Sequence, residues 1–161
     1  MKTDFGKVLK TLKDGRVDFI VIGGVAGVAH GLARATFDVD VVYARNRANV
    51  QRLVQTLKVC EPYLRGAPAG LPFRWDEQTV RLGLNFTLIT SLGDLDLLGE
   101  ITGAGTYEQL LPDTVELDVF GQRCRCITLE RLIQVKRAAG RPKDFEMIAQ
   151  MQALLEERRK S

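Results

Sequence analysis

The chain has 161 residues, of which 45% are hydrophobic and 27% charged, enough for one globular domain with its own core. A net charge of +3 is too small to indicate nucleic acid by itself, and no apolar run approaches the ~20 residues that span a bilayer. The N-terminus lacks the apolar segment of a signal peptide, and three cysteines are typical of a reducing compartment. We therefore expect a cytoplasmic protein without a membrane partner. Cys124 and Cys126 have no second pair, which favours packed thiols over a zinc site.

The first half of the chain predicts helices alternating with strands. Thr3 or Asp4 can cap an amphipathic helix that ends near Gly15, because either side chain can accept a hydrogen bond from a free helix N–H. The elements that follow are a buried strand over 17–22, a small-residue helix over 24–32, a strand over 37–43, and a helix from Asn46 or Asn49 to Leu57. Residues 65–78, with their glycines and prolines, predict an irregular loop.

The second half begins with three predicted strands, over 79–84, 86–90 and 95–98. A short helix over 107–111, a hairpin over 115–127, a helix from Thr128, a break at 140–144 and a last helix to about 158 complete the prediction. This mixture indicates an α/β (α+β) fold, with a mixed, twisted sheet, flanking helices and a two-helix C-terminal extension. We expect a single domain over 1–161, with a core at about 15–127 and the extension at about 128–159.

Two aspartates on the strand over 37–43 carry the first chemical signal. Asp38 and Asp40 alternate with valines, so both carboxylates point to the same side of an extended strand. Adjacent carboxylates repel each other unless they are protonated or neutralised, and a hard divalent cation is their natural partner. Gly23 and Gly24, in a turn before a helix, are suited to a close approach by phosphates. A metal-bound nucleotide is the hypothesis that follows.

A dinucleotide-binding Rossmann protein is a competing interpretation of the same glycines. Its fingerprint requires G-x-G-x-x-G after the first strand and an acidic residue about twenty positions later. Here Ile22 stands at the first glycine position, and no carboxylate occurs over 43–46. The pattern therefore favours the metal–nucleotide hypothesis.

Two motifs resemble the signature of the nucleotidyltransferase superfamily related to DNA polymerase β. They are Ile22-Gly23-Gly24 and Asp38-Val39-Asp40-Val41, followed by a carboxylate on a later strand. A minimal bacterial branch, the abortive-infection and toxin-type nucleotidyltransferases, is similar in two further pieces. These pieces are Arg34-Ala-Thr36-Phe-Asp38-Val-Asp40, and Lys136 followed by Arg141-Pro-Lys143-Asp144. The resemblance covers roughly residues 17–150.

The resemblance implies transfer of an NMP group from an NTP to an acceptor hydroxyl with release of pyrophosphate, supported by two Mg²⁺ ions or by Mn²⁺. It implies a catalytic and metal-binding set of Asp38, Asp40 and a third carboxylate. We favour Asp96 as the third, since it lies deeper in its strand than Asp94, which follows the turn residue Gly93. The nucleotide-binding residues it implies are Gly23, Gly24, Arg34, Thr36, Lys136 and Lys143.

Structural explanations remain open for several of these residues. Arg34 can form a salt bridge, Lys136 can extend along an apolar helix to solvent, and Asp144 can simply cap the last helix. His30 is expected to pack or to form hydrogen bonds rather than catalyse. Loop residues Arg65, Phe73, Arg74 and Trp75 either contact the acceptor or, in the case of Trp75, fill the core.

The sequence does not identify the acceptor, which is a small molecule such as an antibiotic, a protein side chain or an RNA 3′ end. The alternative from another class is a catalytically silent nucleotide- or partner-binding module, for example within a toxin–antitoxin pair with a cognate antitoxin or helical partner. All the expected carboxylates are present, which favours the enzyme.

Overall fold

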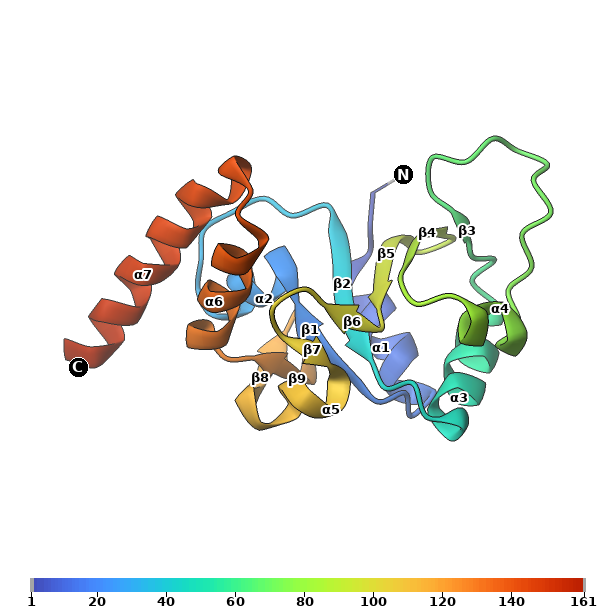
Figure 1. Ribbon diagram of the computed structural model, residues 1–161, viewed down its shortest axis with the longest axis horizontal. Helices are drawn as coiled ribbons and strands as arrows, with labels where there is room; N and C mark the ends of the chain where they lie inside the picture. The colour runs from blue at the N-terminus through green and yellow to red at the C-terminus, as the bar shows by residue number, and fades with distance from the viewer. Residues whose placement is uncertain (1, 161) are drawn as a thin grey trace.

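The computed structural model describes residues 2–160 and contains one mixed sheet of seven strands (Figure 1). These strands are β1 (Phe19–Ile22), β2 (Asp38–Tyr43), β3 (Tyr63–Leu64), β4 (Phe86–Thr90), β5 (Gly93–Leu98), β8 (Thr114–Val119) and β9 (Gln122–Ile127). Their order across the sheet is β3-β4-β5-β2-β1-β9-β8. A separate two-stranded hairpin consists of β6 (Glu100–Ile101) and β7 (Gly105–Thr106).

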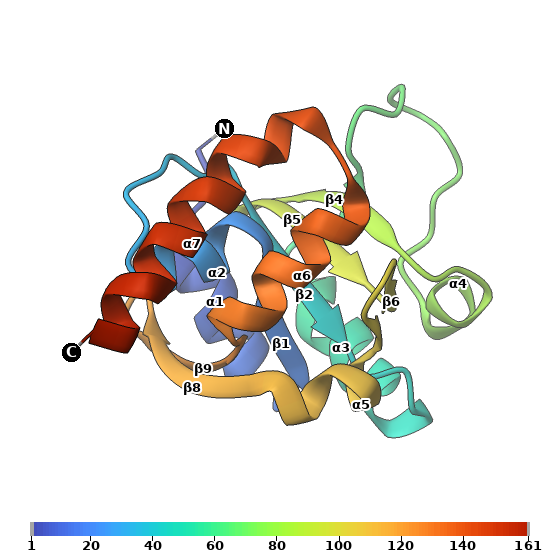
Figure 2. The ribbon, with the colours of Figure 1, turned by 60° about the vertical axis from the view of Figure 1, so that its left-hand side comes forward.

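The helices surround this sheet. They are α1 (Phe5–Asp14), α2 (Gly23–Ala29), α3 (Arg47–Lys58), α4 (Glu77–Leu82), α5 (Tyr107–Leu110), α6 (Leu129–Ala139) and α7 (Phe145–Lys160). Helices α6 and α7 lie together at the end of the molecule that holds α2, whereas α3, α4 and the loop before α4 form the opposite end (Figures 1 and 2). The predicted α/β class, with a mixed, twisted sheet and two C-terminal helices, is confirmed. Within residues 2–160, no helix is both long and apolar enough for a membrane span.

Strand β2 lies at the centre of the sheet and determines which carboxylates meet. It pairs antiparallel with β1, which brings Ile22 opposite Asp40. On its other side it pairs parallel with β5, with Asp38 opposite Asp94 and Asp40 opposite Asp96. Residues directly opposite each other on paired strands point to the same face of a sheet. The four aspartates therefore share one face.

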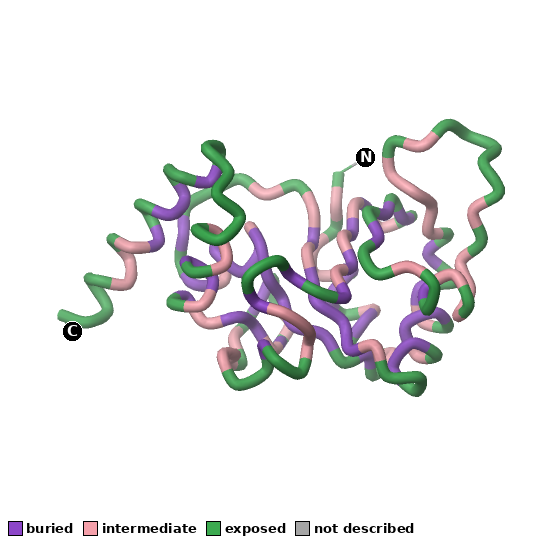
Figure 3. Tube along the Cα trace, viewed as in Figure 1, coloured by how far each residue is buried: buried purple, intermediate pink, exposed green. Residues whose placement is uncertain are grey.

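The other face of the same two strands belongs to the hydrophobic core. Val39, Val41, Leu95 and Leu97 are at most 1% exposed, whereas the aspartates between them are only partly buried. Figure 3 shows burial concentrated along the central strands and exposure along the loop over 65–76. Along β2 and β5, apolar residues and aspartates therefore alternate between the core face of the sheet and its polar face.

The N-terminal helices begin at the expected kind of residue. Of the two candidate caps for α1, the structure uses Asp4, whose carboxylate accepts a hydrogen bond from the Lys7 N–H at 3.1 Å. Asn46 caps α3 by accepting from the Asn49 N–H. Asn49, the other candidate, is fully buried, and its side-chain amide donates to the carbonyls of Asp18 and Ala44.

One predicted strand is wrong. Residues 79–84 were expected to be extended, but α4 covers Glu77–Leu82. The carboxylate of Asp76 accepts a hydrogen bond from the Thr79 N–H at 2.8 Å, so it caps a helix at this point. Val80 is the one buried residue of this helix, which means that a single apolar anchor, rather than a strand face, holds the segment.

Three short strands were not predicted, because a strand of two residues is too short to show an alternation of apolar and polar side chains. Strand β3 is a two-residue edge strand that pairs with β4, and β6 and β7 are equally short. The remaining boundaries differ little: α2 begins at Gly23 rather than at 24 and ends at Ala29.

Candidate active site

The carboxylates of β2 and β5 form a compact acidic cluster. One oxygen from each of Asp38, Asp40 and Asp96 lies within 4.8 Å of the other two, a spacing at which three carboxylates can hold a metal ion. Asp96 is therefore brought into this cluster, as expected from its position within β5. The Asp94 side chain is 30% exposed, against 23% for Asp96, so the expected difference in depth is present but small.

Asp40 is the carboxylate with the most perturbed surroundings. Burial, and then the negative charges of Asp38 and Asp96, together raise its pKa to about 8, against a partial offset from Lys136. The pKa of Asp38 is also raised, first by burial and then by the charge of Asp96. Asp40 Oδ1 is buried and has no hydrogen-bond partner among the described residues. A cation in this cluster would satisfy that oxygen and remove the repulsion.

Gly23 leaves space for the side chain of Asp40. It has a φ of +67°, which favours glycine, and a Cβ at this position would overlap the Asp40 carboxylate. A Cβ on Gly24 would lie 2.9 Å from Thr36 Oγ1, which is also too close. Both glycines therefore allow the start of α2 to approach β2 and the residues just before it, and Gly23 brings its backbone next to the Asp40 carboxylate.

Arg65 reaches the acidic cluster from the edge of the sheet at β3. Its Nη2 lies 2.6 Å from Asp96 Oδ1 and 3.7 Å from Asp38 Oδ2, and its Nη1 lies 3.8 Å from Asp94 Oδ2. Arg65 was expected in a loop that contacts an acceptor. Its ion pairs with the carboxylates could not be foreseen, because they depend on β3 pairing with β4 at the edge of the sheet.

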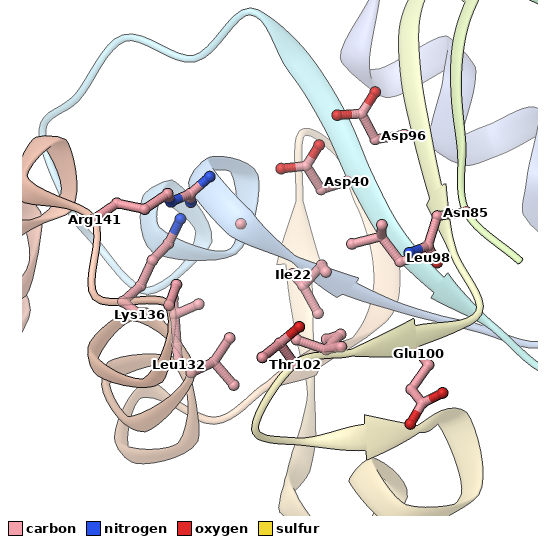
Figure 4. Close-up of a pocket in the computed structure, with 14 residues that line it drawn as sticks. Ile22, Asp40, Asn85, Asp96, Leu98, Glu100, Thr102, Leu132, Lys136 and Arg141 are labelled. Carbon is pink, nitrogen blue, oxygen red and sulfur yellow. The ribbon is translucent and has the colours of Figure 1, made fainter.

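A pocket of about 330 Å³ opens beside the acidic cluster, between the sheet, α6 and the β6–β7 hairpin. Asp40 and Asp96 lie on one side of it, and Lys136 and Arg141 reach toward it from the other (Figure 4). Its apolar lining consists of Ile22, Leu98, Ile101, Leu132, Val135 and Ala139. The pocket thus has an apolar surface between an acidic side and a basic side.

Asp144 holds the two cations of this pocket. It is 7% exposed, and its carboxylate pairs with Arg141 Nε at 2.7 Å and with Lys136 Nζ at 3.6 Å. Asp144 is the last residue of a 3-10 turn, Pro142–Asp144, directly before α7, and its carboxylate forms both ion pairs from there. Arg141 lies within the motif Arg141-Pro-Lys143-Asp144, but no role was predicted for it. The signal was the spacing of three between Arg141 and Asp144, which places the two side chains together on one turn.

Three other predicted nucleotide-binding residues lie elsewhere. Lys143 is exposed and is not among the described residues that line the pocket. Arg34 is also exposed, and its guanidinium donates to Gln150 Oε1 of α7 at 3.2 Å. Thr36 Oγ1 donates to the Asp38 carbonyl at 3.4 Å, which supports the entrance to β2. Their roles toward a nucleotide stay predictions.

The aromatic residues of the loop have structural partners. Trp75 Nε1 donates to the Val54 carbonyl at 3.1 Å, and its ring meets Phe86 edge-on, so Trp75 packs against the core. Phe73 makes a similar edge contact with Tyr63. Arg74 remains exposed.

His30 and the cysteines are structural, as expected. His30 is 7% exposed, and its Nε2 lies 2.7 Å from the Ile127 carbonyl. Cys60, Cys124 and Cys126 are buried, reduced thiols. Burial raises the pKa of Cys124 to about 11 and that of Cys126 to about 12, so neither thiol is reactive at neutral pH.

Comparison with solved structures shows where this arrangement of strands recurs. A protein from Thermotoga maritima provisionally assigned as a nucleotidyltransferase (TM1012) is 14% identical, with a TM-score of 0.57 over 94% of this chain and 90% of that one. The lincosamide antibiotic adenylyltransferase LnuA, solved with lincomycin bound, is 15% identical, with a TM-score of 0.60 over 92% of this chain and 94% of that one. No protein-family model and no curated protein sequence matches the chain.

These likenesses extend over nearly the whole chain and over nearly the whole of both neighbours. The protein therefore has the fold of the nucleotidyltransferases. This agrees with the superfamily that the glycine and aspartate motifs resemble.

Proposed function

We propose that this protein is a metal-dependent nucleotidyltransferase that moves an NMP group from an NTP to an acceptor hydroxyl and releases pyrophosphate. The observation that carries the proposal is that the acidic cluster and the Lys136–Arg141 pair face each other across one pocket. A nucleoside triphosphate has an aromatic base with apolar faces, a polyanionic tail and a requirement for divalent cations, so it matches the apolar lining, the basic side and the acidic side of the pocket. We further propose that residues 1–161 act as a single domain, since both the core and the helical extension line this pocket.

The acidic cluster suits Mg²⁺ or Mn²⁺. Its donors are carboxylate oxygens, which hard divalent cations prefer, and the buried oxygen of Asp40 needs a positive partner. Asp38, Asp40 and Asp96 would hold the metal. Bound divalent ions, two in the expected mechanism, would activate the acceptor hydroxyl and neutralise the charge that develops on the phosphates.

The remaining residues bind and orient the nucleotide. Lys136 and Arg141 neutralise phosphate charge from the side opposite the carboxylates, and Asp144 keeps both cations in place. Gly23 lets the backbone at the start of α2 approach the phosphates without a side chain in between. The apolar lining of the pocket, including Ile22 and Leu132, receives the base or the ribose.

The experiment is incubation with each NTP, Mg²⁺ or Mn²⁺, and one member of each acceptor class, followed by mass spectrometry of the acceptor and measurement of pyrophosphate. Lincomycin is the first small molecule to test, because one structural neighbour is a lincosamide adenylyltransferase. An RNA with a free 3′ hydroxyl and a mixture of proteins represent the other classes. The expected result is one acceptor heavier by an NMP group.

Two variants provide the controls. Asp38→Asn and Asp96→Asn each remove a proposed metal ligand, so transfer should fall to background while the fold is kept. If the wild-type protein binds the metal–nucleotide complex but modifies none of the three classes, the alternative of a nucleotide- or partner-binding module, such as half of a toxin–antitoxin pair, replaces the enzyme proposal.

A further inference from the structure

Arg65 occupies an unusual position for a side chain from an edge strand. Residue 65 follows β3 directly, and its backbone N–H donates to the Thr87 carbonyl of β4 at 3.0 Å. From there the side chain extends over β4, and Nη1 donates to the Leu88 carbonyl at 3.1 Å. The side chain is 26% exposed, so its path is fixed largely by protein contacts. The guanidinium ends within the acidic cluster.

Two of the three proposed metal ligands are in contact with this guanidinium. Nη2 lies 2.6 Å from Asp96 Oδ1 and 3.7 Å from Asp38 Oδ2. A divalent cation held by the same two carboxylates would be repelled by the guanidinium and would compete with it for their negative charge. Metal binding at these carboxylates and the present position of Nη2 therefore oppose each other.

Asp94 offers Arg65 a second partner at the edge of the cluster. Nη1 lies 3.8 Å from Asp94 Oδ2, and Asp94 is the carboxylate that is not part of the compact triad. The guanidinium can keep the Leu88 carbonyl and Asp94 while it gives up Asp96. This gives a role to Asp94, a fourth carboxylate that lies beside the three proposed metal ligands.

We propose that Arg65 is an internal cation that neutralises Asp96 and Asp38 in the metal-free protein and withdraws to Asp94 when metal binds. Arg65 and Asp94 are thus positioning residues for the metal ligands. This inference rests on the proposed function only in that it requires a metal at the acidic cluster. It assigns the roles of two residues that the transfer reaction itself does not define.

The test compares wild type with Arg65→Met, by calorimetric titration with Mn²⁺ alone and by thermal unfolding in a chelator. Removal of the competing cation should tighten Mn²⁺ binding by about fivefold, since a partly exposed charge-assisted pair is given up. The metal-free variant should melt below wild type, because Asp38, Asp94 and Asp96 lose their internal cation. Saturating Mn²⁺ should close most of that difference. Arg65→Lys retains the charge and should lie between the two proteins in both measurements.

Arg74→Met is the matched control. It removes the same charge from the same loop, but Arg74 is exposed and its electrostatic partner is Asp76 rather than the acidic cluster. Its Mn²⁺ affinity and its metal-free melting temperature should equal those of wild type. A tightening equal to that of Arg65→Met would mean that net charge alone is responsible, and it would overturn the proposal.

Asp94→Asn tests the second position of the guanidinium. In the wild-type background it should weaken Mn²⁺ binding, because Arg65 then has only Asp96 and Asp38 as partners. In the Arg65→Met background the same substitution should have a clearly smaller effect, as in a double-mutant cycle. Equal effects in both backgrounds would contradict the assignment of Asp94.

The outcomes for Arg65 and for the metal site are distinguishable. Equal or weaker Mn²⁺ binding by Arg65→Met, beside a wild type that binds, overturns the role of Arg65 and leaves the metal site intact. If neither protein binds Mn²⁺, both the inference and the metal dependence of the proposed function fail.

Discussion

Gly23 and Asp40 lie so close together that a methyl group on the glycine would overlap the carboxylate. They meet because Gly23, the first residue of α2, directly follows β1, and Ile22 at the end of β1 pairs with Asp40 of the antiparallel strand β2. The glycine is therefore needed for two reasons, its φ of +67° and the space that the carboxylate takes. The first motif of the chain thus shapes the acidic cluster as well as the turn.

Gly23→Ala should abolish Mn²⁺ binding and nucleotidyl transfer, because Asp40 has to move. Gly121→Ala is the control, since Gly121 also has a positive φ, +84°, but nothing within 4 Å of an added Cβ. Both variants should lose about 1–2 kcal/mol of unfolding free energy from backbone strain, measured by urea denaturation. Retention of full Mn²⁺ affinity by Gly23→Ala would show that Asp40 does not depend on this contact.

Asp40 should make the stability of the metal-free protein depend on pH. Its pKa is about 8 in the folded protein against an ordinary value of 3.8, so between these two values the folded state binds a proton that the unfolded state lacks. Stability is therefore highest below about pH 4 as far as this group is concerned, and it is lost as the pH rises to about 8.

Asp40→Asn removes this dependence. In a chelator at pH 9 the variant should be more stable than wild type by up to about 6 kcal/mol, because the pKa of Asp40 lies about four units above its ordinary value and one unit corresponds to about 1.4 kcal/mol, with a smaller difference at pH 5. Urea denaturation at the two pH values measures it. Asp14→Asn changes an exposed carboxylate paired with Lys10 and should leave the wild-type slope unchanged. If the unfolding free energy of Asp40→Asn changes with pH as steeply as that of wild type, another group is responsible for the pH dependence.

The basic side of the pocket predicts which cations bind the nucleotide. Lys136→Met and Arg141→Met should each weaken binding of a non-hydrolysable NTP analogue by about 1–2 kcal/mol, the usual loss for a charge-assisted contact. Lys143→Met should have little effect, because Lys143 is exposed and does not line the pocket within the described chain. Calorimetric titration measures all three, and unfolding curves verify the fold of each variant. If only Lys143→Met weakens binding, Lys143 contacts the phosphates and the two cations that line the pocket do not.

His30 offers a probe of the contact between α2 and α7. Burial lowers its pKa, and the charge of Arg158 lowers it further, against the hydrogen bond to the Ile127 carbonyl. It is the single histidine of the chain, so one NMR titration gives its midpoint, which should lie below the ordinary 6.5. The unfolded protein then takes up this proton first, and stability should fall as the pH drops below 6.5.

Arg158→Met tests the cause of that shift. The guanidinium lies 3.3 Å from His30 Nδ1 and donates to the His30 carbonyl at 2.6 Å. Without it the midpoint should move upward, toward the ordinary value. A midpoint that stays in place would assign the lowered pKa to burial alone.

The sequence by itself determined the elements that bear the site and the face to which their carboxylates point. Asp38 and Asp40 alternate with valines whose burial is strongly favourable, so only one orientation of β2 keeps both sets satisfied. The same reasoning predicted Asp96 on the strand that is β5, and backbone preference predicted Gly23 in the turn between β1 and a helix. Local periodicity and backbone preference are properties of neighbouring residues, which explains why a single sequence reveals them.

The tertiary structure alone decided which charges meet. Arg65 reaches Asp96 only because β3 pairs with β4 at the sheet edge, and Arg141 rather than Lys143 lines the pocket because Asp144 holds it there. Residues 79–82 are helical rather than extended, because the Asp76 cap and the buried Val80 outweigh the strand-like pattern of their side chains. Ion pairs across the fold depend on distances between residues far apart in the chain. Such distances follow from the packing of the whole sheet, which no local pattern encodes.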